Sequence, residues 1–348
     1  MKAVILAAGF GKRLRPLTDY LPKVLVPVLG VPAIDHVVER LLLQGVQKIG
    51  VNVHYRAGQI RSHLESAFLE GKGKGRGEVC IAHEEEILGT GGAIYNFRDF
   101  LRGDEPFWVY NGDIVSDIDL PSALHFHRTK KPLATLILWD YPPINTVSMD
   151  SKGNILSLFS RPASCADSLP SAGSVGQSTL TFTGISILSP RILDYMPEGY
   201  SEIPGIYQSI IAAKGQGAGK ICGFRGRGRY WADFGTVSSY LDVHRDLLLD
   251  RPQSAIKGAG ICSPEAGRRS IGCVYRSGKR GTIARSAQLG GFVSMADGCV
   301  IEDDVFLEDC VLWPGTRVLA GTRAQRAVLS QDFLCREKEK DGRREPMS

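Results

Sequence analysis

The sequence predicts a Rossmann-like, doubly wound α/β domain with a mostly parallel sheet, followed by a short left-handed parallel β-helix. Up to about residue 245, short apolar runs that favour strands alternate with helix-like segments, as in open sheets covered by helices. Beyond residue 250, small and apolar residues recur at six-residue steps. The chain has 348 residues, 43% of them hydrophobic, so it can bury one large core and a smaller second one.

The first domain is predicted from six apolar runs and two amphipathic segments. The runs are expected to be strands: Ala3–Leu6, Ile49–Val53, Glu78–Ile81, Phe107–Tyr110, Leu133–Leu138 and Leu180–Leu188. Residues 34–43 carry apolar side chains at positions 37, 38, 41 and 42, which is helical spacing. Gln59–Leu69 has the same amphipathic character. We therefore expect one α/β domain over residues 1–250.

The six-residue step is clearest at Ala287, Val293, Cys299, Val305 and Val311. It matches neither the period of a helix nor the simple alternation of a strand. A parallel β-helix explains it, because each flat side contributes one short strand and successive coils stack; an irregular β-rich tail is the alternative. We expect this domain over residues 255–332 and a frayed tail over the charged residues 333–348.

The composition favours a protein of the cytoplasm that binds neither nucleic acid nor membrane. The net charge of +5 arises from 42 basic and 37 acidic residues, a balance too even to indicate a nucleic-acid partner. No segment approaches the roughly 18 consecutive apolar residues of a membrane span. The eight cysteines include no C-x-x-C pair, which fits free thiols in a reducing compartment.

A phosphate-binding loop is predicted directly after the first strand. Residues 6–18 read Leu-Ala-Ala-Gly-Phe-Gly-Lys-Arg-Leu-Arg-Pro-Leu-Thr. Gly9 and Gly11 can adopt positive φ, which lets successive N–H groups turn inward as an anion nest. Cationic side chains follow at positions 12, 13 and 15, and Lys23 stands after a rigid proline. Small residues beside clustered cations are what a polyphosphate requires.

Other phosphate-binding motifs fit the sequence less well. Gly9-x-Gly11 after a strand is half of the dinucleotide fingerprint, but Leu14 stands where the third glycine belongs. The Walker pattern needs four residues between its glycines, which this loop does not have. The glycine- and lysine-rich residues 71–77 lack a strand that leads into a helix, so we interpret them as a solvated surface loop.

The loop, followed by Pro-Lys at positions 22 and 23, resembles the signature of the sugar nucleotidyltransferases. That family joins a nucleoside triphosphate to a sugar 1-phosphate and releases pyrophosphate. The resemblance implies that Arg13 stabilises the departing pyrophosphate and that Lys23 contacts the sugar phosphate or the α-phosphate. It also implies nucleotide binding by Leu6, Ala7, Ala8, Gly9, Gly11 and Lys12. Such a transfer needs positioning and charge neutralisation more than a covalent nucleophile.

Two aspartates are the expected ligands of Mg²⁺. The apolar run Phe-Trp-Val-Tyr before Asn-Gly-Asp places Asp113 at a carboxyl end of the sheet, where ligands bind in open α/β folds. One carboxylate together with triphosphate oxygens makes an ordinary magnesium site. Residues 230–236 resemble the Trp-x-Asp-x-Gly-Thr segment of the family, which implies that Asp233 is the second ligand. Asp117 and Asp119 are the nearby alternatives.

Residues 83–93, His-Glu-Glu-Glu-Ile-Leu-Gly-Thr-Gly-Gly-Ala, resemble the base-and-ribose loop of the family. The resemblance places Gly89 and Thr90 under the nucleoside and Glu84 near the base edge. The acidic run is similar to that of mannose-1-phosphate guanylyltransferases, and a carboxylate can accept hydrogen bonds from the N1–H and amino groups of guanine. GTP with mannose 1-phosphate is therefore the expected pair, and a solvated row of glutamates is the alternative interpretation.

The sugar is expected to bind beside residues 180–187, Leu-Thr-Phe-Thr-Gly-Ile-Ser-Ile. This run resembles the family strand whose glycine lets the hexose approach the backbone, which implies contacts from Thr183 and Gly184. Arg161 stands where many relatives carry the lysine of Glu-Lys-Pro, and its guanidinium can pair with phosphate. The region is also similar to N-acetylmuramate-1-phosphate uridylyltransferases, so uridylyl or thymidylyl transfer to another sugar 1-phosphate is an alternative.

Two further functions are considered for the whole chain. An acyltransferase site in the β-helix would use a histidine, yet all seven histidines precede residue 255. A catalytically silent regulatory subunit that binds a nucleotide sugar could dispense with the two aspartates, whereas this chain keeps both. For the β-helix we expect a homo-oligomer contact or support of the catalytic domain.

Overall fold

The computed structural model describes residues 1–69, 77–159, 178–213, 219–250, 271–276 and 281–337. The chain forms two compact units. The first comprises residues 1–10 and 34–232, and the second comprises residues 11–33 and 233–348. The chain therefore passes between the units after Phe10, after Ala33 and after Ala232. The predicted division near residue 250 follows the order of the sequence, whereas these units are interleaved.

A nine-stranded sheet forms the centre of the first unit. Its strands are β1 (Lys2–Leu6), β4 (Lys48–Val53), β5 (Glu78–His83), β6 (Phe107–Asn111), β8 (Ala134–Trp139), β9 (Val147–Met149), β10 (Ile155–Ser157), β11 (Ser178–Leu188) and β12 (Ile221–Arg225). Strands β6, β1, β4 and β5 run parallel in this order, and β12 is parallel to β8. The antiparallel β11 lies between β6 and β8. The expected mostly parallel sheet is confirmed.

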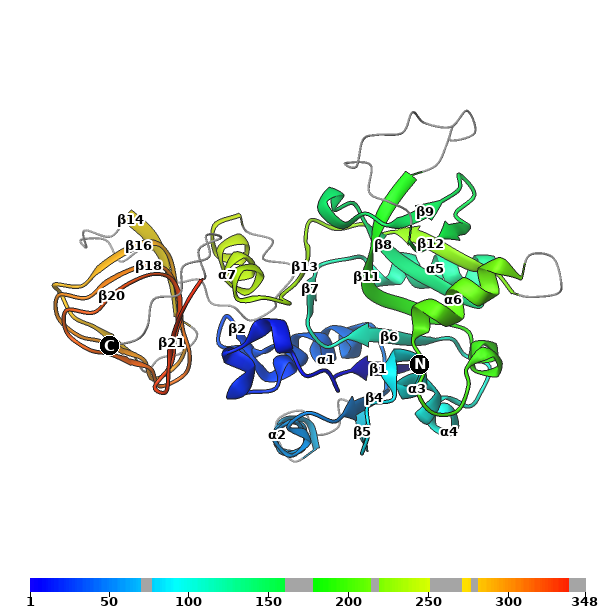
Figure 1. The fold of residues 1–348 in the computed structure, drawn as a ribbon, viewed down its shortest axis with the longest axis horizontal. Helices are drawn as coiled ribbons and strands as arrows, with labels where there is room; N and C mark the ends of the chain where they lie inside the picture. The colour runs from blue at the N-terminus through cyan, green and yellow to red at the C-terminus, as the bar shows by residue number, and fades with distance from the viewer. Residues whose placement is uncertain (70–76, 160–177, 214–218, 251–270, 277–280, 338–348) are drawn as a thin grey trace. The chain divides into compact units, whose positions relative to one another are not determined.

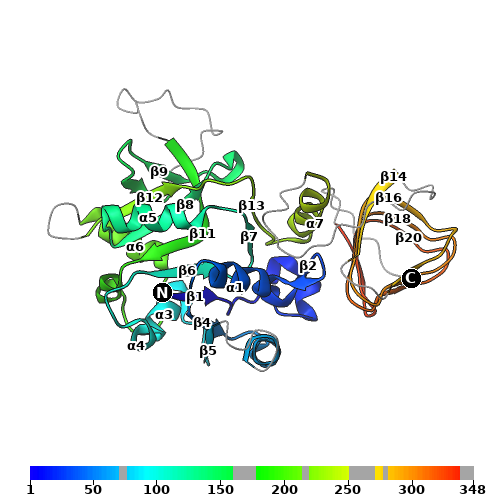
Figure 2. The ribbon, with the colours of Figure 1, turned by 180° about the vertical axis from the view of Figure 1, so that it is seen from behind.

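Helices cover this sheet, as Figures 1 and 2 show from opposite sides. They are α1 (Ala33–Leu43), α2 (Ala57–Leu64), α3 (Gly89–Asn96), α4 (Arg98–Leu101), α5 (Leu120–Lys130) and α6 (Ile203–Ala212). Helix α5 packs against β8, α6 against β10 and β12, and α2 against β4 and β5. The two helices predicted from the sequence are α1 and α2, and α2 continues as a π-helical turn over Glu65–Leu69.

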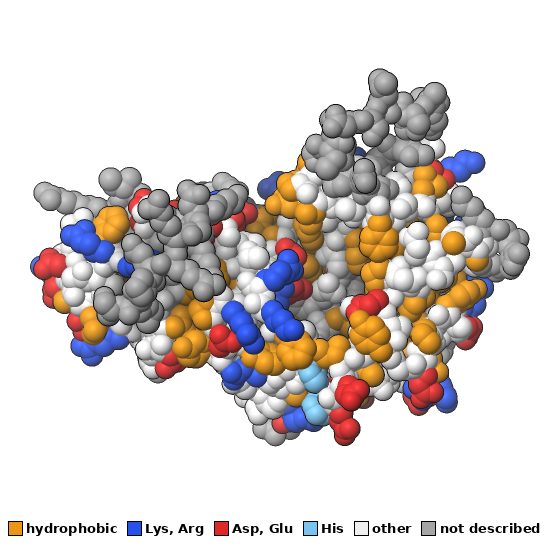
Figure 3. Space-filling model, viewed as in Figure 1, with side chains coloured by type: hydrophobic (Ala, Val, Ile, Leu, Met, Phe, Trp, Pro, Cys, Tyr) orange, Lys and Arg blue, Asp and Glu red, His pale blue; other side chains and the backbone are white. Residues whose placement is uncertain are grey.

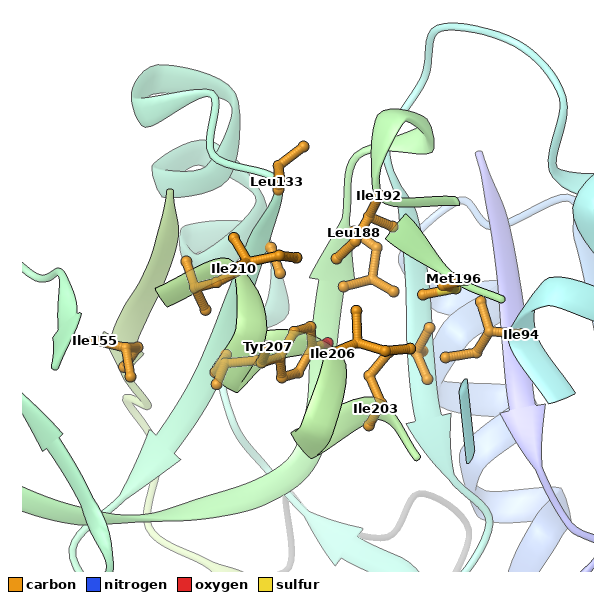
Figure 4. Close-up of a cluster of buried hydrophobic side chains, with 14 of the residues drawn as sticks. Ile94, Leu133, Ile155, Leu188, Ile192, Met196, Ile203, Ile206, Tyr207 and Ile210 are labelled. Carbon is orange, nitrogen blue, oxygen red and sulfur yellow. The ribbon is translucent and has the colours of Figure 1, made fainter. Parts of the chain in front are cut away.

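Helix α6 contributes one face to the main core of the first unit. Figure 4 shows Ile203, Ile206, Tyr207 and Ile210 clustered with Leu188 of β11. Their spacing of three and four residues places these α6 side chains on one face of the helix. Each fully buried side chain of this size is worth about 1.5–3 kcal/mol. This face of α6 thus packs on the sheet where Leu188 pairs with Phe107, the first residue of β6.

The C-terminal strands of the second unit stack side by side and fit a β-helix (Figure 1). One sheet contains β14 (Ile271–Arg276), β16 (Gln288–Met295), β18 (Phe306–Leu312), β20 (Arg323–Leu329) and β21 (Leu334–Arg336), and another contains β15 (Thr282–Ile283), β17 (Val300–Ile301) and β19 (Arg317–Val318). Leu289 pairs with Leu307 and Val300 with Arg317, so one coil takes 17 or 18 residues. That length is about three of the six-residue steps.

The last strand closes the stack. Leu334–Arg336 belong to the tail that the sequence analysis expects to be frayed, yet they form β21 and pair antiparallel with β20. Val328, for example, is the partner of Cys335. The pairing satisfies backbone groups on the outer edge of β20, which explains why these residues are ordered. Residues 338–348 of the predicted tail lie outside the described residues.

The second unit also contains the chain that follows Phe10. Three short 3₁₀ segments, Lys12–Leu14, Leu17–Asp19 and Lys23–Leu25, lead into a hairpin of β2 (Pro27–Val28) and β3 (Val31–Pro32). Helix α7 (Val237–Arg245) packs against β16, β18 and β20 of the β-helix. This unit therefore joins N-terminal and C-terminal parts of the chain.

The molecular surface carries both signs of charge. Basic and acidic side chains are interspersed over the face seen in Figure 3. Of the helices within the described ranges, none combines the length and the apolar character of a bilayer-spanning segment. Cys80, Cys222, Cys299 and Cys310 are free thiols, as expected.

Candidate active site

The phosphate loop begins where three parallel strands end side by side. Leu6, the last residue of β1, pairs with Asn52 on β4 and with Asn111 on β6. The Leu6 carbonyl accepts a hydrogen bond from Gly112 N, with an N–O distance of 3.0 Å. Asp113 comes directly after this turn. It therefore follows the carboxyl end of its strand, which is the sheet edge predicted for it.

A buried chain of hydrogen bonds holds this edge together. Asn52 Oδ1 accepts from Ala7 N at 2.8 Å, and Asn52 Nδ2 donates to Glu84 Oε1 at 2.7 Å. The second oxygen, Glu84 Oε2, accepts from Leu88 N at 3.0 Å. Glu84 is only 3% exposed. Its carboxylate therefore ties the loop after β5 to Asn52 of β4, and Asn52 in turn holds the start of the loop after β1. The contact of Glu84 with a nucleobase stays a prediction.

The two glycines of the phosphate loop differ in conformation. Gly11 is left-handed, with φ of 63°, and a Cβ there would lie 2.7 Å from Thr18 Cγ2. Thr18 Oγ1 donates to the Gly11 carbonyl at 3.0 Å, which fixes the turn. Gly9 does not have the positive φ that the sequence permits, and a Cβ there would meet no atom within 4 Å. The space beside Gly9 allows a ligand to approach the backbone closely.

The two predicted catalytic cations lie against the segment that follows Asp233. A Cβ on Gly235 would lie 2.8 Å from Arg13 Nη2, so the guanidinium packs on the open side of that glycine. Lys23 Nζ lies 5.6 Å from the centroid of the Phe234 ring, which is a cation–π distance. The second unit thus brings Arg13 and Lys23 together with a motif that is distant in sequence.

The same motif starts helix α7. Thr236 is the N-cap residue, and its Oγ1 accepts a hydrogen bond from Ser239 N at 3.1 Å. Ser239 Oγ in turn accepts from Thr236 N at 3.0 Å, which completes a capping box. The threonine of the motif therefore has a structural explanation, because it fixes the direction in which the chain leaves Gly235.

The two predicted metal ligands flank one two-stranded ribbon. Strand β7 (Ile114–Ser116) pairs with β13 (Trp231–Asp233). Asp113 directly precedes β7, and Asp233 is the last residue of β13. Within the described ranges, no group of three or more His, Cys, Asp and Glu side chains is placed to hold a metal ion. A magnesium site made of two carboxylates and phosphate oxygens does not require such a group.

The alternative ligands Asp117 and Asp119 have structural roles. Asp117 Oδ1 accepts hydrogen bonds from Arg229 N at 2.7 Å and from Tyr230 N at 2.8 Å. Asp119 is the N-cap of α5, and its Oδ1 accepts from Ser122 N at 3.1 Å. The hydrogen bonds from Ser122 lower the pKa of Asp119. These contacts give both carboxylates a structural role, and metal binding by either stays a prediction.

The predicted nucleoside loop, at the start of α3, packs against residues 199–202. Gly89 has φ of 70°, and a Cβ there would lie 2.5 Å from the Ser201 carbonyl oxygen. Thr90 Oγ1 donates to Glu202 Oε2 at 2.7 Å, and Thr90 N donates to the same oxygen at 3.3 Å. Close packing within the protein thus requires glycine at position 89 whether or not a nucleoside binds there.

The predicted sugar residues sit on an irregular part of β11. Thr183 is completely buried, and its Oγ1 donates to the Ile137 carbonyl at 2.8 Å. Gly184 has φ of 76°, and a Cβ there would lie 2.6 Å from Asn111 Nδ2. The register of β11 against β8 shifts at this point. Burial gives Thr183 a structural role, and sugar binding by either residue stays a prediction. Arg161 lies outside the described residues.

Several residues that shape this region escaped the sequence analysis. Asn52, Thr18 and Glu202 each hold a predicted binding residue through a side-chain hydrogen bond. Asn52 carried one usable signal, because it interrupts an otherwise apolar strand. Glu202 carried none, because its partner Thr90 is more than a hundred positions away.

The family model described as nucleotidyl transferase matches residues 2–249. The chain belongs to this family. The match covers the first unit, the phosphate loop, Asp233 and α7, and it ends before the β-helix. All the predicted site residues of this nucleotidyltransferase thus lie within the matched segment.

Curated relatives match this nucleotidyltransferase over nearly its whole length. A UTP–glucose-1-phosphate uridylyltransferase from Synechocystis is 28% identical and covers 92% of this chain and 86% of its own. Mannose-1-phosphate guanylyltransferase 1 from Arabidopsis thaliana is 29% identical, covering 91% of this chain and 82% of its own. A mannose-1-phosphate guanylyltransferase from Mycobacterium tuberculosis is 27% identical and covers 93% of this chain and 83% of its own.

Solved structures share the fold of the nucleotidyltransferase. HddC from Yersinia pseudotuberculosis, complexed with GMP-PN, has a TM-score of 0.54 and 22% identity, and it covers 71% of this chain and 99% of its own. A putative glucose-1-phosphate thymidylyltransferase from Bacillus anthracis has a TM-score of 0.56 and 22% identity, and it covers 72% of this chain and 96% of its own. This likeness confirms the mixed α/β, Rossmann-like fold.

Proposed function

We propose that this nucleotidyltransferase transfers a nucleotidyl group from a nucleoside triphosphate to a sugar 1-phosphate, with GTP and mannose 1-phosphate as the preferred pair. The observation that carries the proposal is the contact of Arg13 and Lys23 with Gly235 and Phe234, directly after Asp233. Two fixed cations next to a carboxylate suit a substrate with several phosphates and a bound divalent ion.

The proposed reaction is a single in-line displacement. An oxygen of the sugar phosphate attacks the α-phosphorus of the triphosphate, and the bond from this phosphorus to the bridging oxygen breaks. Pyrophosphate leaves with that electron pair toward Arg13. Backbone N–H groups near Gly9 and Gly11 hold the triphosphate, and Lys23 neutralises the phosphate oxygens that approach one another. Catalysis then depends on position and charge rather than on a nucleophilic side chain.

Magnesium is the proposed metal, with Asp113 and Asp233 as its protein ligands. The donor set fits, because Mg²⁺ prefers carboxylate and phosphate oxygens and usually keeps several waters. The pairing of β7 with β13 supports the choice, since one aspartate precedes the first strand and the other ends the second. When bound, the ion would neutralise charge on the phosphates.

The choice of base and sugar rests on narrower grounds. Two of the relatives described above are mannose-1-phosphate guanylyltransferases, and another is a uridylyltransferase of glucose 1-phosphate. The acidic run from Glu84 to Glu86 favours guanine, since free carboxylates can accept from its N1–H and amino groups. Glu84 is occupied by Asn52 and Leu88, so Glu85 or Glu86 is the better candidate for that contact.

We also propose that the β-helix is left-handed and that it supports the catalytic part of the chain or joins copies of it.

We propose that the protein works in the cytosol. The free thiols support this location, because an oxidising compartment would favour disulfides. Burial raises the pKa of the Cys310 thiol to about 12, which keeps it protonated and unreactive.

A substrate matrix tests the proposed function. The full-length protein would be incubated with each of GTP, UTP, dTTP and ATP against mannose, glucose, heptose and amino-sugar 1-phosphates, with Mg²⁺ or with EDTA, and pyrophosphate release measured. We expect the largest kcat/KM for GTP with mannose 1-phosphate and no release in EDTA. A preference for UTP or dTTP would replace the proposed pair. Absence of release in every combination would support the regulatory subunit instead.

A further inference from the structure

Aromatic side chains connect the phosphate loop with the β-helix inside the second unit. Tyr20, two residues after the phosphate loop, packs on Phe333 with ring centroids 4.6 Å apart, and Phe333 meets Trp313 edge-on at 5.1 Å. Tyr240 of α7, whose hydroxyl accepts a hydrogen bond from Trp313, packs against Phe234 with ring centroids 5.9 Å apart. The Phe234 ring is the one that lies beneath Lys23 Nζ. The contacts thus connect Tyr20 and Lys23, two residues of the segment after the phosphate loop, through the β-helix and α7.

Hydrogen bonds reinforce the same connection. Trp313 Nε1 donates to the Tyr240 hydroxyl at 3.2 Å, and this hydroxyl donates to the Pro27 carbonyl. Tyr240 is completely buried, and burial raises the pKa of its hydroxyl, so the proton that it donates is retained at all working pH values. Pro27 lies only four residues after Lys23. A side chain of the β-helix is therefore linked through Tyr240 to the backbone four residues beyond Lys23.

His244 holds the next residues of the hairpin. Its Nε2 accepts a hydrogen bond from Leu29 N at 3.1 Å, and its Nδ1 lies 3.0 Å from the Tyr240 carbonyl oxygen. Because Leu29 N can only donate, Nε2 must be the acceptor and Nδ1 must carry the proton. His244 is completely buried. The hairpin after Lys23 is thus tied to α7 at Pro27 and at Leu29.

We propose that Trp313 is a positioning residue for the transfer reaction, acting through Tyr240 to fix the segment from Lys23 to Leu29. This inference rests on the proposed function, in which Lys23 contacts the phosphates. It assigns the β-helix a part in catalysis, because the indole N–H orients the hydroxyl that holds the Pro27 carbonyl. A displacement of about 1 Å in a phosphate-binding cation is enough to reduce turnover strongly.

Two conservative substitutions isolate the hydrogen bonds from the packing. Trp313→Phe removes the indole donor but keeps a ring against Phe333, and Tyr240→Phe removes the hydroxyl but keeps the ring against Phe234. Leu307→Val is the matched control, since Leu307 is completely buried in the interior of the β-helix and belongs to its own hydrophobic cluster. All variants would be made in the full-length protein and checked by thermal unfolding.

The first readout is independent of activity. Hydrogen exchange of the backbone amides from residues 24 to 30 would be followed by mass spectrometry. We expect exchange at least about tenfold faster in Trp313→Phe and Tyr240→Phe than in the wild type, because the Pro27 contact is weakened. The Leu307→Val control should match the wild type. Unchanged exchange in both aromatic variants would overturn the proposal.

The second readout separates positioning from stability. With the best pair from the substrate matrix, we expect kcat/KM for the sugar 1-phosphate to fall about tenfold in each aromatic variant. The double variant should be no worse than Tyr240→Phe alone, because Trp313 acts through that hydroxyl. Normal kinetics in folded variants with faster exchange would refute the catalytic role. If the wild type turned over no pair of triphosphate and sugar 1-phosphate, the proposed function would be wrong. Hydrogen exchange of residues 24 to 30 would then decide whether Trp313 fixes this segment.

Discussion

At the scale of single residues, the phosphate loop owes its form to contacts that a motif does not display. Gly11 is required because its φ is positive and because Thr18 fills the space where a side chain would go. Gly9 has no such constraint, and the space beside it remains for a ligand. The sequence identified both glycines as special but gave them one shared reason. The contact between Thr18 and Gly11, seven residues apart, shows that the two glycines are needed for different reasons.

This difference predicts opposite results for two alanine substitutions. Gly11→Ala should lower the free energy of unfolding by about 1–3 kcal/mol, because a side chain at positive φ is strained and would meet Thr18. Gly9→Ala should leave stability unchanged and raise the KM for the triphosphate. Urea unfolding and steady-state kinetics on the two proteins would check this. Equal loss of stability in both would contradict the assignment.

A second prediction concerns the buried amide of Asn52. Asn52→Ala would leave Ala7 N and Glu84 Oε1 without their partner, and an unsatisfied buried group costs about 1–3 kcal/mol. We expect that loss in chemical denaturation together with a higher KM for the triphosphate. The matched variant Asn96→Ala, at an exposed position in α3, should behave like the wild type. A silent Asn52→Ala would rule out this role.

At the scale of secondary structure, periodicity predicted the elements well and their partners poorly. The strands β1, β4, β5 and β6 and the helices α1 and α2 were found because their apolar spacing reflects burial. The antiparallel direction of β11 and its register shift near Gly184 were not predictable. The side chain that Gly184 faces there is Asn111, a residue of another strand. Nor does the sequence of residues 333–337 show that β20 has an unpaired edge on which this segment can pair.

Helix α5 provides a prediction about pH. His127 is buried against β8, where its Nδ1 lies 2.9 Å from Thr135 Oγ1, and burial lowers the pKa of His127 to about 4. The unfolded chain binds a proton near pH 6.5, so the folded state loses stability as pH falls from about 6.5 to about 4. The loss should approach about 3 kcal/mol.

Denaturation at pH 7 and at pH 4.5 would measure this effect. His127→Gln should remove most of the pH dependence that belongs to this site, whereas His125→Gln, at an exposed position on the same helix, should keep it. If the two variants showed the same pH dependence, burial of His127 would not be its source.

At the scale of the whole molecule, the chain order hides how the predicted catalytic residues are distributed between the two units. The sequence predicted a catalytic domain followed by a β-helix, but Arg13 and Lys23 belong to the same compact unit as the β-helix. The cause is physical: Gly235, Phe234 and Tyr240 pack on the loop across more than 200 positions of sequence. Local patterns cannot report such contacts. The roles that the resemblance of motifs implies for Arg13 and Lys23 stay predictions.

We propose that Asp113, Asp233, Arg13 and Lys23 serve one transfer from a triphosphate to a sugar 1-phosphate. The most direct test is to quantify both products by mass spectrometry, with sugar 1-phosphate labelled by ¹⁸O in its phosphate, for wild type and Asp113→Asn. We expect equal amounts of nucleotide sugar and pyrophosphate, the label only in the nucleotide sugar, and at least about a hundredfold slower turnover in a folded Asp113→Asn. Label in pyrophosphate, or full turnover by Asp113→Asn, would contradict it.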